Sequence, residues 1–409
     1  MELKKYKLGE IGNIQMCKRI LKSETNPYTG IPFYKIGTFG KNADSFIDPQ
    51  LYHRYRNTYS FPKKGDVLIS AAGTIGRSVI YNGEDAYFQD SNIVWIEHDQ
   101  TIVLNEYLYY VLNSIHWTPS KGSTILRLYN DDIKNKEVYL PSISIQKVVS
   151  LVLSNIDHKI KVNRAINQNL EAMAKQLYDY WFVQFDFPNE EGKPYKSSGG
   201  AMVWNEKLKR EIPKGWFCGT LLDIAEYTNG LACQKYRPTD NNKLPVIKIK
   251  EMHDGLSVDT EWVKADIPDD VKVFDGDVLF SWSASLEVML WAYGNGGLNQ
   301  HIFKVTSKNG YPRSFYFYQL VHYIGVFKQM AEARKTTMGH ITQDHLRQST
   351  IVLPPDVDIA NKLEEKLCPI FDAIVKNSQE IMTLTKQRDE LLPLLMNGQA
   401  TVNYHLSAC

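Results

Sequence analysis

The sequence predicts two similar globular domains of mixed α/β (α+β) structure, separated by two long antiparallel helices that form a coiled-coil-like spacer. Three observations predict this fold: an internal duplication, a change of composition within each copy, and a heptad-like apolar stripe that closes each copy. The two copies would be related by a pseudo-twofold axis. With 409 residues, 43% of them hydrophobic, the chain can build two or three domains with sizeable cores.

The duplication rests on five sequence blocks that recur in the same order, 211 to 213 positions further along the chain. Such a constant offset indicates two copies of one unit. The matching blocks are 32–36 with 245–249, 65–70 with 276–281, 121–124 with 334–337, 131–134 with 344–347, and 140–141 with 353–354.

The first part of each copy consists of short β-branched and aromatic runs broken by Gly, Pro, Asn and Asp. This texture predicts a compact domain with a mainly β core over residues 1–141, and a second such domain with a preceding linker over 188–354. Strands are expected at 67–69 and 93–96, with counterparts near Val278 and Ile302, and shorter helices at 104–114 and 314–330. Residues 189–200 have the composition of a linker.

The second part of each copy is predicted to be a long helix, at 142–187 and, with a tail, at 355–409. Pro393 is expected to end or kink the second helix. Asn163 and Asn377 fall 214 positions apart at core-facing positions, where a buried Asn fixes the register; the alternative is an exposed Asn on a splayed helix. The stripes comprise Val149, Leu153, Ile156, Ile160, Leu170, Leu177 and Trp181, and then Leu363, Leu367, Ile370, Ile374, Ile381, Leu384 and Leu391.

Charge and cysteine content narrow the class of protein. The formal net charge is only +1, but residues 34–77 are locally basic, which suits either nucleic-acid binding or a solvated face. The five cysteines are scattered and contain no Cys-x-x-Cys pair, which favours a reducing compartment and argues against a zinc site. No apolar run approaches the roughly 18 residues of a membrane span, so we expect a soluble, cytoplasmic protein without a membrane partner.

Two domains held apart by a rigid spacer suit a twofold-symmetric polymer, and double-stranded DNA is such a polymer. The loops expected to reach it differ between the copies: residues 71–77 read Ala-Ala-Gly-Thr-Ile-Gly-Arg, whereas 282–286 read Trp-Ser-Ala-Ser-Leu. A retained scaffold with diverged loops predicts a reader of two unlike half-sites. Drift in loops without a role is the alternative.

The motifs resemble those of the specificity subunits of type I restriction-modification systems. Lys-Lys-Gly-Asp-Val-Leu-Ile-Ser at 63–70, Gly-Thr-Ile-Gly-Arg at 73–77 and Tyr-Phe-Gln-Asp-Ser-Asn-Ile at 87–93 are similar to that family's target-recognition domain. The helical segments from 156 to 182 and from 388 to 398 resemble its central and distal conserved regions. The block order covers essentially the whole chain, and the second domain is the weaker match at 282–286.

The resemblance implies a subunit that binds a bipartite DNA target and docks two methyltransferase subunits. Motor-nuclease restriction subunits would join through them. The chain itself would hold no cofactor, because S-adenosylmethionine for adenine N6 methylation would sit on the methyltransferase.

Catalytic and metal-binding residues are not expected in this chain. Asn26-Pro27-Tyr28 is close to the Asn-Pro-Pro-Tyr of adenine methyltransferases, but the second Pro and a Gly-rich cofactor turn are missing. Pro355-Asp356 with 364–366 is close to a nuclease metal motif, but these residues are predicted to open a helix. No Walker loop or His-Glu-x-x-His motif occurs.

DNA contacts are expected from cations and from polar side chains that can reach phosphates or base edges. A solvated or structural role is the alternative for each residue, and Gly73 and Gly76 either let the backbone approach DNA or form a turn. The predicted contacts in the first domain are Lys35, Gly73, Thr74, Gly76, Arg77, Gln89, Ser91, Lys121, Ser123, Thr124 and Arg127. Those in the second are Lys248, Ser283, His301, Arg334, Lys335, Thr336 and His340.

Tyr178, Tyr180 and Phe182 are predicted to be exposed residues that contact the methyltransferase, with a place in the helix-packing core as the alternative. A different class of function also fits the architecture. In it, the chain is a coiled-coil scaffold or adaptor whose globular heads bind protein, and it would show no salt-dependent affinity for DNA.

Overall fold

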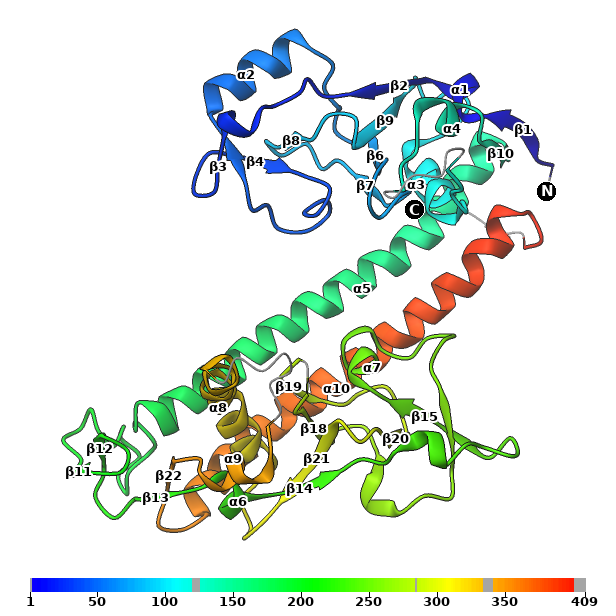
Figure 1. Cartoon of the computed structure of the whole chain (residues 1–409). Coiled ribbons are helices and arrows are strands. Elements are labelled where there is room, and N and C mark those ends of the chain that lie inside the picture. The colour runs from blue at the N-terminus through cyan, green and yellow to red at the C-terminus, as the bar shows by residue number, and fades with distance from the viewer. Residues whose placement is uncertain (1, 120–125, 284, 334–340, 401–409) are drawn as a thin grey trace. The chain divides into compact units, whose positions relative to one another are not determined.

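The computed structural model describes residues 2–119, 126–283, 285–333 and 341–400 of the chain (Figure 1). It divides into two compact units: unit 1 comprises Met1–His158 with Thr385–Cys409, and unit 2 comprises Lys159–Leu384. Each unit contains one globular head and part of each long helix. Among the described residues, no helix is both long and apolar enough to cross a bilayer.

The head of unit 1 is built on two four-stranded sheets. The first has the strand order β2-β9-β6-β7 and is antiparallel throughout, and the second has the order β3-β5-β4-β8 with β4 parallel to β8. A separate antiparallel pair, β1 with β10, joins the two ends of the head. Its elements are β1 (Lys4–Lys7), α1 (Leu8–Ile11), β2 (Asn13–Met16), β3 (Thr25–Asn26), β4 (Ile31–Tyr34), β5 (Phe46–Ile47), α2 (Pro49–Thr58), β6 (Val67–Ser70), β7 (Ser78–Ile80), β8 (Tyr87–Phe88), β9 (Ile93–Glu97), α3 (Asn105–Ser114), α4 (Asn130–Lys134) and β10 (Glu137–Leu140).

The core of this head lies on both faces of the first sheet. Val67 and Ile69 of β6 point to one face and pack with α3 and with the first turns of the following long helix. Leu68 points to the other face and packs with Trp95 and with aromatic side chains of the second sheet. Adjacent residues of one strand therefore serve two different cores, as the period of two requires, so Val67, Leu68 and Ile69 are all apolar.

The head of unit 2 repeats this architecture. Its sheet β14-β21-β18-β19 has the order and directions of β2-β9-β6-β7, and β15 is parallel to β20 as β4 is to β8. The pair β13 with β22 corresponds to β1 with β10. Its elements are β13 (Phe217–Gly219), α6 (Leu221–Ile224), β14 (Ala225–Asn229), β15 (Lys243–Ile247), α7 (Ile249–Asp254), β16 (Trp262–Lys264), β17 (Lys272–Val273), β18 (Val278–Ser281), β19 (Glu287–Leu290), β20 (Gly296–Leu298), β21 (Ile302–Ser307), α8 (Arg313–Ala333), α9 (Gln343–Arg347) and β22 (Ile351–Leu353).

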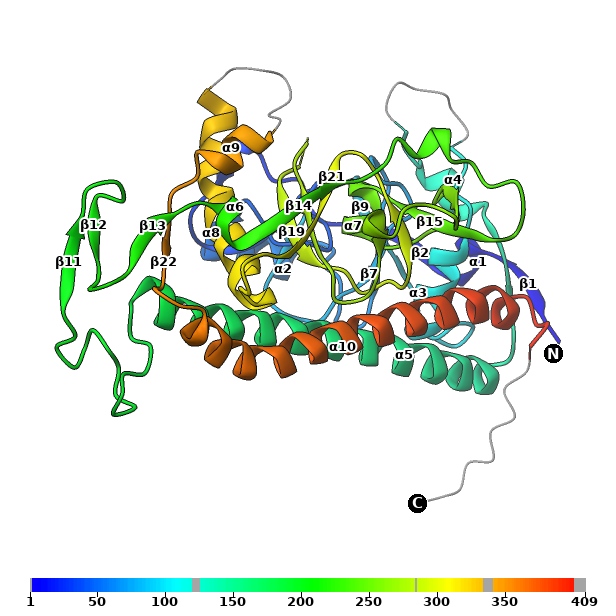
Figure 2. The same ribbon diagram turned by 90° about the horizontal axis from the view of Figure 1, so that it is seen from below.

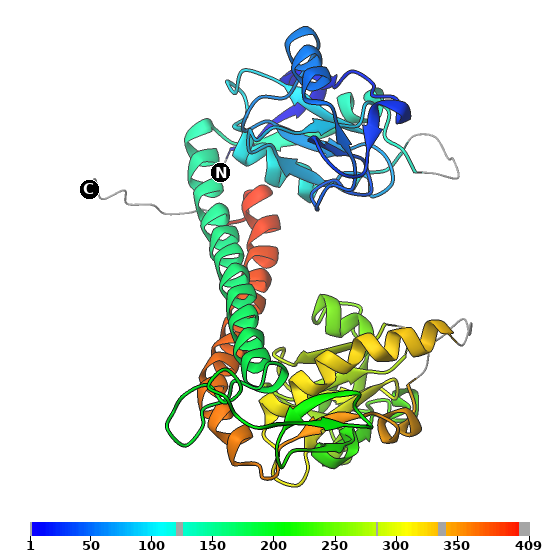
Figure 3. The same ribbon diagram turned by 90° about the vertical axis from the view of Figure 1, so that its left-hand side faces the viewer.

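The internal duplication is thus confirmed element by element, and the differences are local. Within the described ranges, the helix α2 has no counterpart in the second head; Asp48 caps its first turn and Pro49 opens it. The fourth strand of the second sheet is β3 in one head and β17 in the other. In unit 2, α8 runs along the main sheet (Figure 3) and is much longer than its counterpart α3.

The predicted linker at 189–200 belongs to an ordered part of unit 2. Asp186 accepts hydrogen bonds from the backbone and hydroxyl of Ser197, and Tyr195 stacks on Phe187 with ring centroids 4.8 Å apart. A hairpin of β11 (Met202–Asn205) and β12 (Arg210–Pro213) follows. The composition suggested a linker, but Tyr195 within the segment packs on Phe187 before it and anchors it.

The long helices are α5 (Ile143–Tyr178), which continues into a π-helical turn over Asp179–Val183, and α10 (Asp358–Met396). Within unit 2 they run antiparallel and side by side (Figure 2), because Lys159 pairs with Glu380 while Asn167 contacts Ile374. Pro393 was expected to end or kink α10, and the expectation that it ends the helix is wrong. The helix continues to Met396 because Pro393 is exposed and only one turn from the end, where the Asn397 amide donates to the Pro393 carbonyl.

Polar residues face one another between the helices of unit 2. Asn163 Nδ2 donates to Glu380 Oε2 at 2.9 Å, and Asn377 Nδ2 donates to Asn167 Oδ1 at 2.9 Å. Asn163 and Asn377, which lie 214 positions apart, therefore each donate a hydrogen bond to the opposite helix. Asn163 is buried and Asn377 is half-buried, and both bond across the helix pair, which agrees with the register interpretation and not with an exposed Asn on a splayed helix.

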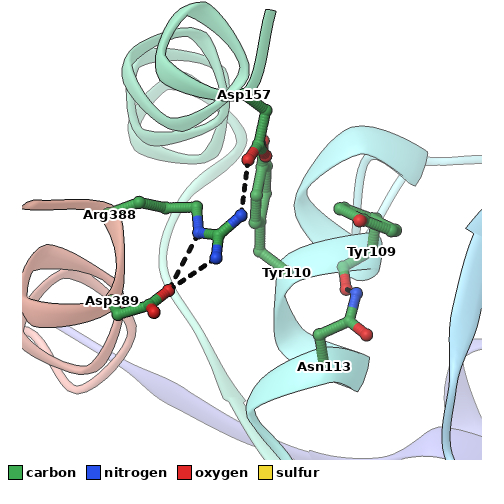
Figure 4. Close-up of polar contacts among 6 residues, drawn as sticks. All are labelled: Tyr109, Tyr110, Asn113, Asp157, Arg388 and Asp389. Atoms are coloured by element: carbon green, nitrogen blue, oxygen red, sulfur yellow. Dashed lines mark hydrogen bonds and ion pairs between the residues drawn. The ribbon is translucent and has the colours of Figure 1, made fainter. Parts of the chain in front are cut away.

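Unit 1 holds its own helix segments together with a different polar cluster (Figure 4). Asp157 of α5 accepts from the Tyr110 hydroxyl of α3 at 2.8 Å and from the Arg388 guanidinium of α10 at 3.0 Å. Arg388 also donates to Asp389. Burial alone would lower the pKa of Arg388, but the hydrogen bonds to Asp157 and Asp389 outweigh it and raise that pKa. One carboxylate therefore joins three helices.

Candidate nucleic-acid interface

In the first head, three loops are held together by backbone hydrogen bonds beside the end of β6. The Ala71 amide donates to the Asn92 carbonyl and the Leu128 amide donates to the Ala71 carbonyl, both at 2.7 Å. The Gln89 amide bonds to the Tyr34 carbonyl at 3.0 Å. These bonds, which we call the loop frame, bring the residues after β4, β6 and β8 next to the segment around Arg127.

A polar pocket of about 520 Å³ opens beside this frame. Among the residues that the structure describes, four cationic side chains and one carboxylate, that of Asp90, line it, so it suits an anion. One of the cations, Lys35, is already paired with Asp44 at 2.8 Å. The lining residues are Arg19, Ile20, Lys22, Thr25, Phe33, Lys35, Gln89, Asp90, Ser91, Asn92 and Arg127.

Several predicted residues of the first head meet in this pocket, and their side chains are partly fixed. Arg127 donates to the Ser91 carbonyl at 3.1 Å, and Gln89 Oε1 accepts from the Ile36 amide at 3.1 Å. Ser91 adopts a positive φ of 53°, which a tight loop requires. Lys35, Gln89, Ser91 and Arg127 are therefore neighbours in space, although they are far apart in sequence.

The turn over residues 71–77 presents its residues unequally. Gly73 and Thr74 are exposed, whereas Gly76 is buried against the Trp117 indole. Arg77 is half-buried and donates to the Gly40 carbonyl at 3.3 Å. Gly76 therefore serves to form the turn and does not let the backbone approach DNA, because its surface is covered by protein.

The second head has the same loop frame with different side chains. The Trp282 amide donates to the His301 carbonyl at 3.3 Å and the Ile341 amide donates to the Trp282 carbonyl at 3.0 Å. The Asn299 amide bonds to the Ile247 carbonyl at 3.0 Å. Trp282 thus holds the place of Ala71, and His301 that of Asn92.

A buried serine closes the turn after the central strand in both heads. The Ser70 hydroxyl donates to the Thr74 carbonyl, and the Ser281 hydroxyl donates to the Ser285 carbonyl at 2.6 Å. The second turn lacks the Gly-Thr-Ile-Gly pattern but keeps this closure. The backbone design is therefore shared where the sequence match was weakest.

The predicted residues of the second head have different outcomes. Lys248 lies directly after β15, as Lys35 does after β4, and its hydrogen bond to Glu261 lowers the pKa of that carboxyl. Ser283 is only 6% exposed, so its side chain is not presented at the surface, contrary to the prediction. The predicted contacts Lys121, Ser123, Thr124, Arg334, Lys335, Thr336 and His340 lie outside the described residues.

The prediction that Tyr178 and Phe182 are exposed is wrong. Both belong to the core of unit 2, where Tyr178 stacks on Tyr318 at 4.9 Å and Phe182 packs edge-on against Phe315. Complete burial raises the pKa of Tyr178 far above its ordinary value. Tyr180 alone is exposed; it borders an apolar groove with Met173 and other residues of the same helix end, and contact with a partner there stays a prediction.

Sequence reasoning missed two cations of the pocket, Arg19 and Lys22. They precede the first recurring block, so the duplication gave no reason to select them. A signal was available in the run Lys-Arg-Ile-Leu-Lys at 18–22, which follows β2 and carries exposed cations around a buried isoleucine.

The two motifs close to catalytic ones have structural roles. Asn26 Oδ1 accepts from the amides of Tyr28 and Thr29, which makes a turn between β3 and β4. Glu364 accepts from the Ser314 amide at the start of α8. Among the residues that the structure describes, no group of three or more His, Cys, Asp and Glu side chains could hold a metal ion.

Comparison with known families defines the class. A family model described as "Type I restriction modification DNA specificity domain" matches residues 1–172 and again 213–387. The two matches coincide with the two copies of the duplicated unit. The chain therefore belongs to the family of type I restriction-modification specificity subunits.

Individual relatives agree with this assignment. The chain is 28% identical to the MjaIX specificity subunit of Methanocaldococcus jannaschii, over 84% of this chain and 79% of that one. It is 24% identical to the HindI specificity subunit of Haemophilus influenzae, over 97% and 99% of the two chains. A putative specificity subunit of Haemophilus influenzae is 46% identical, but over only 44% of this chain and 46% of that protein, so this match spans less than half of the relative.

A solved structure supports the fold. The type I restriction-modification S subunit from M. genitalium superposes with a TM-score of 0.60 at 13% identity, over 97% of this chain and 96% of that one. At this level of identity the likeness concerns the fold alone.

Proposed function

We propose that this chain selects the DNA target of a type I restriction-modification complex and carries out no chemistry itself. One target-recognition domain, in residues 1–141, reads one half of a bipartite asymmetric site. The other, in residues 188–354, reads the other half. The long helices dock two methyltransferase subunits, and restriction subunits join the complex through them.

The observation that carries the proposal is the shared loop frame with unlike side chains. Bonds between backbone groups hold the same three loops in both heads, while Ala71 and Asn92 in one are replaced by Trp282 and His301 in the other. A scaffold that repeats while the side chains of its loops change is suited to two related but different ligands. Two half-sites of one DNA duplex are such ligands.

The chemistry of the first pocket supports DNA as the ligand. Phosphate groups require cations, which Arg19, Lys22 and Lys35 supply, and base edges require side chains such as Gln89 and Arg127. Both kinds of group occur side by side around one polar cavity. A protein-binding head would instead be expected to present an apolar centre.

The decisive experiment is a genome-wide map of methyladenine in cells that co-express this chain with its methyltransferase subunit. We expect a motif of two short, unlike blocks separated by a fixed gap. Cells with the methyltransferase alone are the control. No motif beyond that control, with the chain verified as folded and co-purifying with the methyltransferase, would contradict the proposal.

The salt dependence of DNA affinity distinguishes DNA recognition from the scaffold alternative. If the heads bind DNA, the affinity of the purified complex for its target should fall steeply between 50 and 200 mM salt, by about a thousandfold for six phosphate contacts. A double substitution, Arg19→Ala with Lys22→Ala, removes two cations. The slope of log affinity against log salt concentration should then become shallower by the equivalent of about two phosphate contacts. If the complex does not bind DNA even at low salt, the scaffold alternative is favoured.

A further inference from the structure

A cluster of three side chains distinguishes the loop frame of the second head. The Trp282 Nε1–H group donates to Asn229 Oδ1 at 3.0 Å, and the indole lies against the His301 ring with centroids 5.6 Å apart. Phe303 supports the indole from β21, at 5.8 Å. In the first head, Ala71 takes the place of Trp282, and its methyl group is too small to build such a cluster.

Two of the three residues, Trp282 and His301, belong to the loop frame, and Asn229 lies beside them at the end of a neighbouring strand. Trp282 follows β18, His301 precedes β21, and Asn229 ends β14. Asn229 is exposed, and the two rings are half-buried. The cluster is therefore both held by the scaffold and open to a ligand.

Asn229 has a defined orientation because of the indole. The Trp282 Nε1–H group can only donate, so it fixes the carbonyl oxygen of the Asn229 amide towards the ring and directs the amide nitrogen away. An amide oxygen has two lone pairs, and one remains available. Within the described residues, Asn229 Nδ2 donates no hydrogen bond. The amide thus offers one donor and one acceptor side by side.

We propose, building on the function proposed above, that Trp282, Asn229 and His301 read an adenine–thymine pair in the second half-site. A donor beside an acceptor matches N7 and N6 of adenine in the major groove, whereas guanine presents two acceptors there. The edges of the indole and imidazole rings supply the apolar surface that a thymine methyl group requires. Trp282 is the specificity-determining residue, because it both contacts the methyl group and orients the amide.

The test combines the removal of single thymine methyl groups from the DNA with the removal of single side chains from the protein. Each thymine of the target is replaced in turn by deoxyuridine, which lacks only the methyl group, and binding by the complex with its methyltransferase is measured. For the unmodified chain, one replacement in the second half-site should weaken binding about five- to tenfold. The Trp282→Ala complex should not distinguish the two bases at that position.

The methyladenine map gives a second readout. Asn229→Asp replaces an exposed amide by a carboxylate that cannot donate, so preference for adenine at one position of one block should fall about tenfold to a hundredfold. The other block should be unchanged. Trp204→Ala is the matched control, since Trp204 is an exposed tryptophan on the hairpin β11–β12 and the whole motif should survive its loss.

The outcomes separate the two proposals. If the unmodified chain gives no two-block motif, the proposed function fails. If it gives one, and Asn229→Asp leaves both blocks intact, the inference is overturned while the function stands. Deoxyuridine effects that are the same for Trp282→Ala and the unmodified chain would overturn it as well. Trp282→Phe keeps a ring but not the donor, so a folded protein with altered adenine preference remains expected even if Trp282→Ala fails to fold.

Discussion

Gly76 shows how a single residue fixes the shape of the first reading loop. Its φ is 80°, and an added Cβ would lie 2.0 Å from Trp117 Cδ1. Both the backbone conformation and the lack of space demand glycine here. The sequence showed that a turn was present, but the contact with Trp117 depends on a segment forty positions away and could not be inferred.

Gly76→Ala should therefore destabilise unit 1 by about 2–4 kcal/mol, from the left-handed backbone and the overpacked indole together. Gly73→Ala is the matched control: it has a similar φ of 68°, but its nearest neighbour would be Ile36 Cδ1 at 3.3 Å. We expect it to cost only about 1 kcal/mol. Denaturant midpoints of the two variants measure the difference, and equal losses would contradict the role given to Trp117.

At the scale of the element, local pattern predicted most of the fold. The strands at 67–69 and 93–96 and the long helices follow from periodicity and breakers, and they occur as β6, β9, α5 and α10. The helix α2 and the ordered segment at 189–200 were not predicted, although Asp48-Pro49 is a recognisable helix start. Composition alone cannot show that contacts of Asp186 and Tyr195 hold residues 189–200 in place.

The paired asparagines of α5 and α10 should be more important together than singly. Asn167→Leu removes the partner of Asn377 Nδ2 from a buried position, which should cost about 1–3 kcal/mol of unfolding free energy. Replacing Asn377 by Leu as well should recover the part of this loss that comes from the unpaired Asn377 amide, so that only the bonds from Asn167 to Ile374 and Ser378 remain lost. Chemical denaturation of the three variants is the measurement. An additive loss in the double variant would show that the two amides do not act as a pair.

Glu380 gives the same helices a dependence on pH. Hydrogen bonds from Lys159 and then Asn163 lower the pKa of this carboxyl below its usual value of 4.5. Its contribution is therefore complete above that value and is lost as the pH falls through the lowered pKa. Glu380→Gln should be less stable than the unmodified chain at pH 7, and the difference in thermal midpoint should shrink as the pH falls through the lowered pKa of Glu380. A difference that grows in acid would contradict this assignment.

At the scale of the whole molecule, the duplication predicted which segments form the site but not which residues complete it. Lys35, Gln89, Ser91 and Arg127 were selected from sequence and meet in one pocket, because the loops that carry them follow strands of the same head. Arg19 and Lys22 complete that pocket from outside the recurring blocks. Tyr178 and Phe182 were misjudged because an aromatic residue near a helix end suits either a surface or a core.

The presence of two heads in one chain predicts a strong dependence on both half-sites. Once one head is bound, the other searches at a high local concentration, so a duplex with both blocks should bind about a hundred- to ten-thousandfold more tightly than one with a scrambled block. Competition binding with the complex measures this ratio. Scrambling the gap sequence at constant length is the control, and a ratio near one would show that the heads bind independently.

The backbone construction of the loop frame has a consequence for how such proteins diversify. Its defining bonds join amides to carbonyls, so the replacement of Ala71 by Trp282 and of Asn92 by His301 leaves every one of them in place. Selection can therefore exchange these side chains one at a time while the backbone bonds that define the frame stay in place. If the heads read DNA as proposed, a lineage that carries this frame can change its target sequence through a few substitutions in these loops.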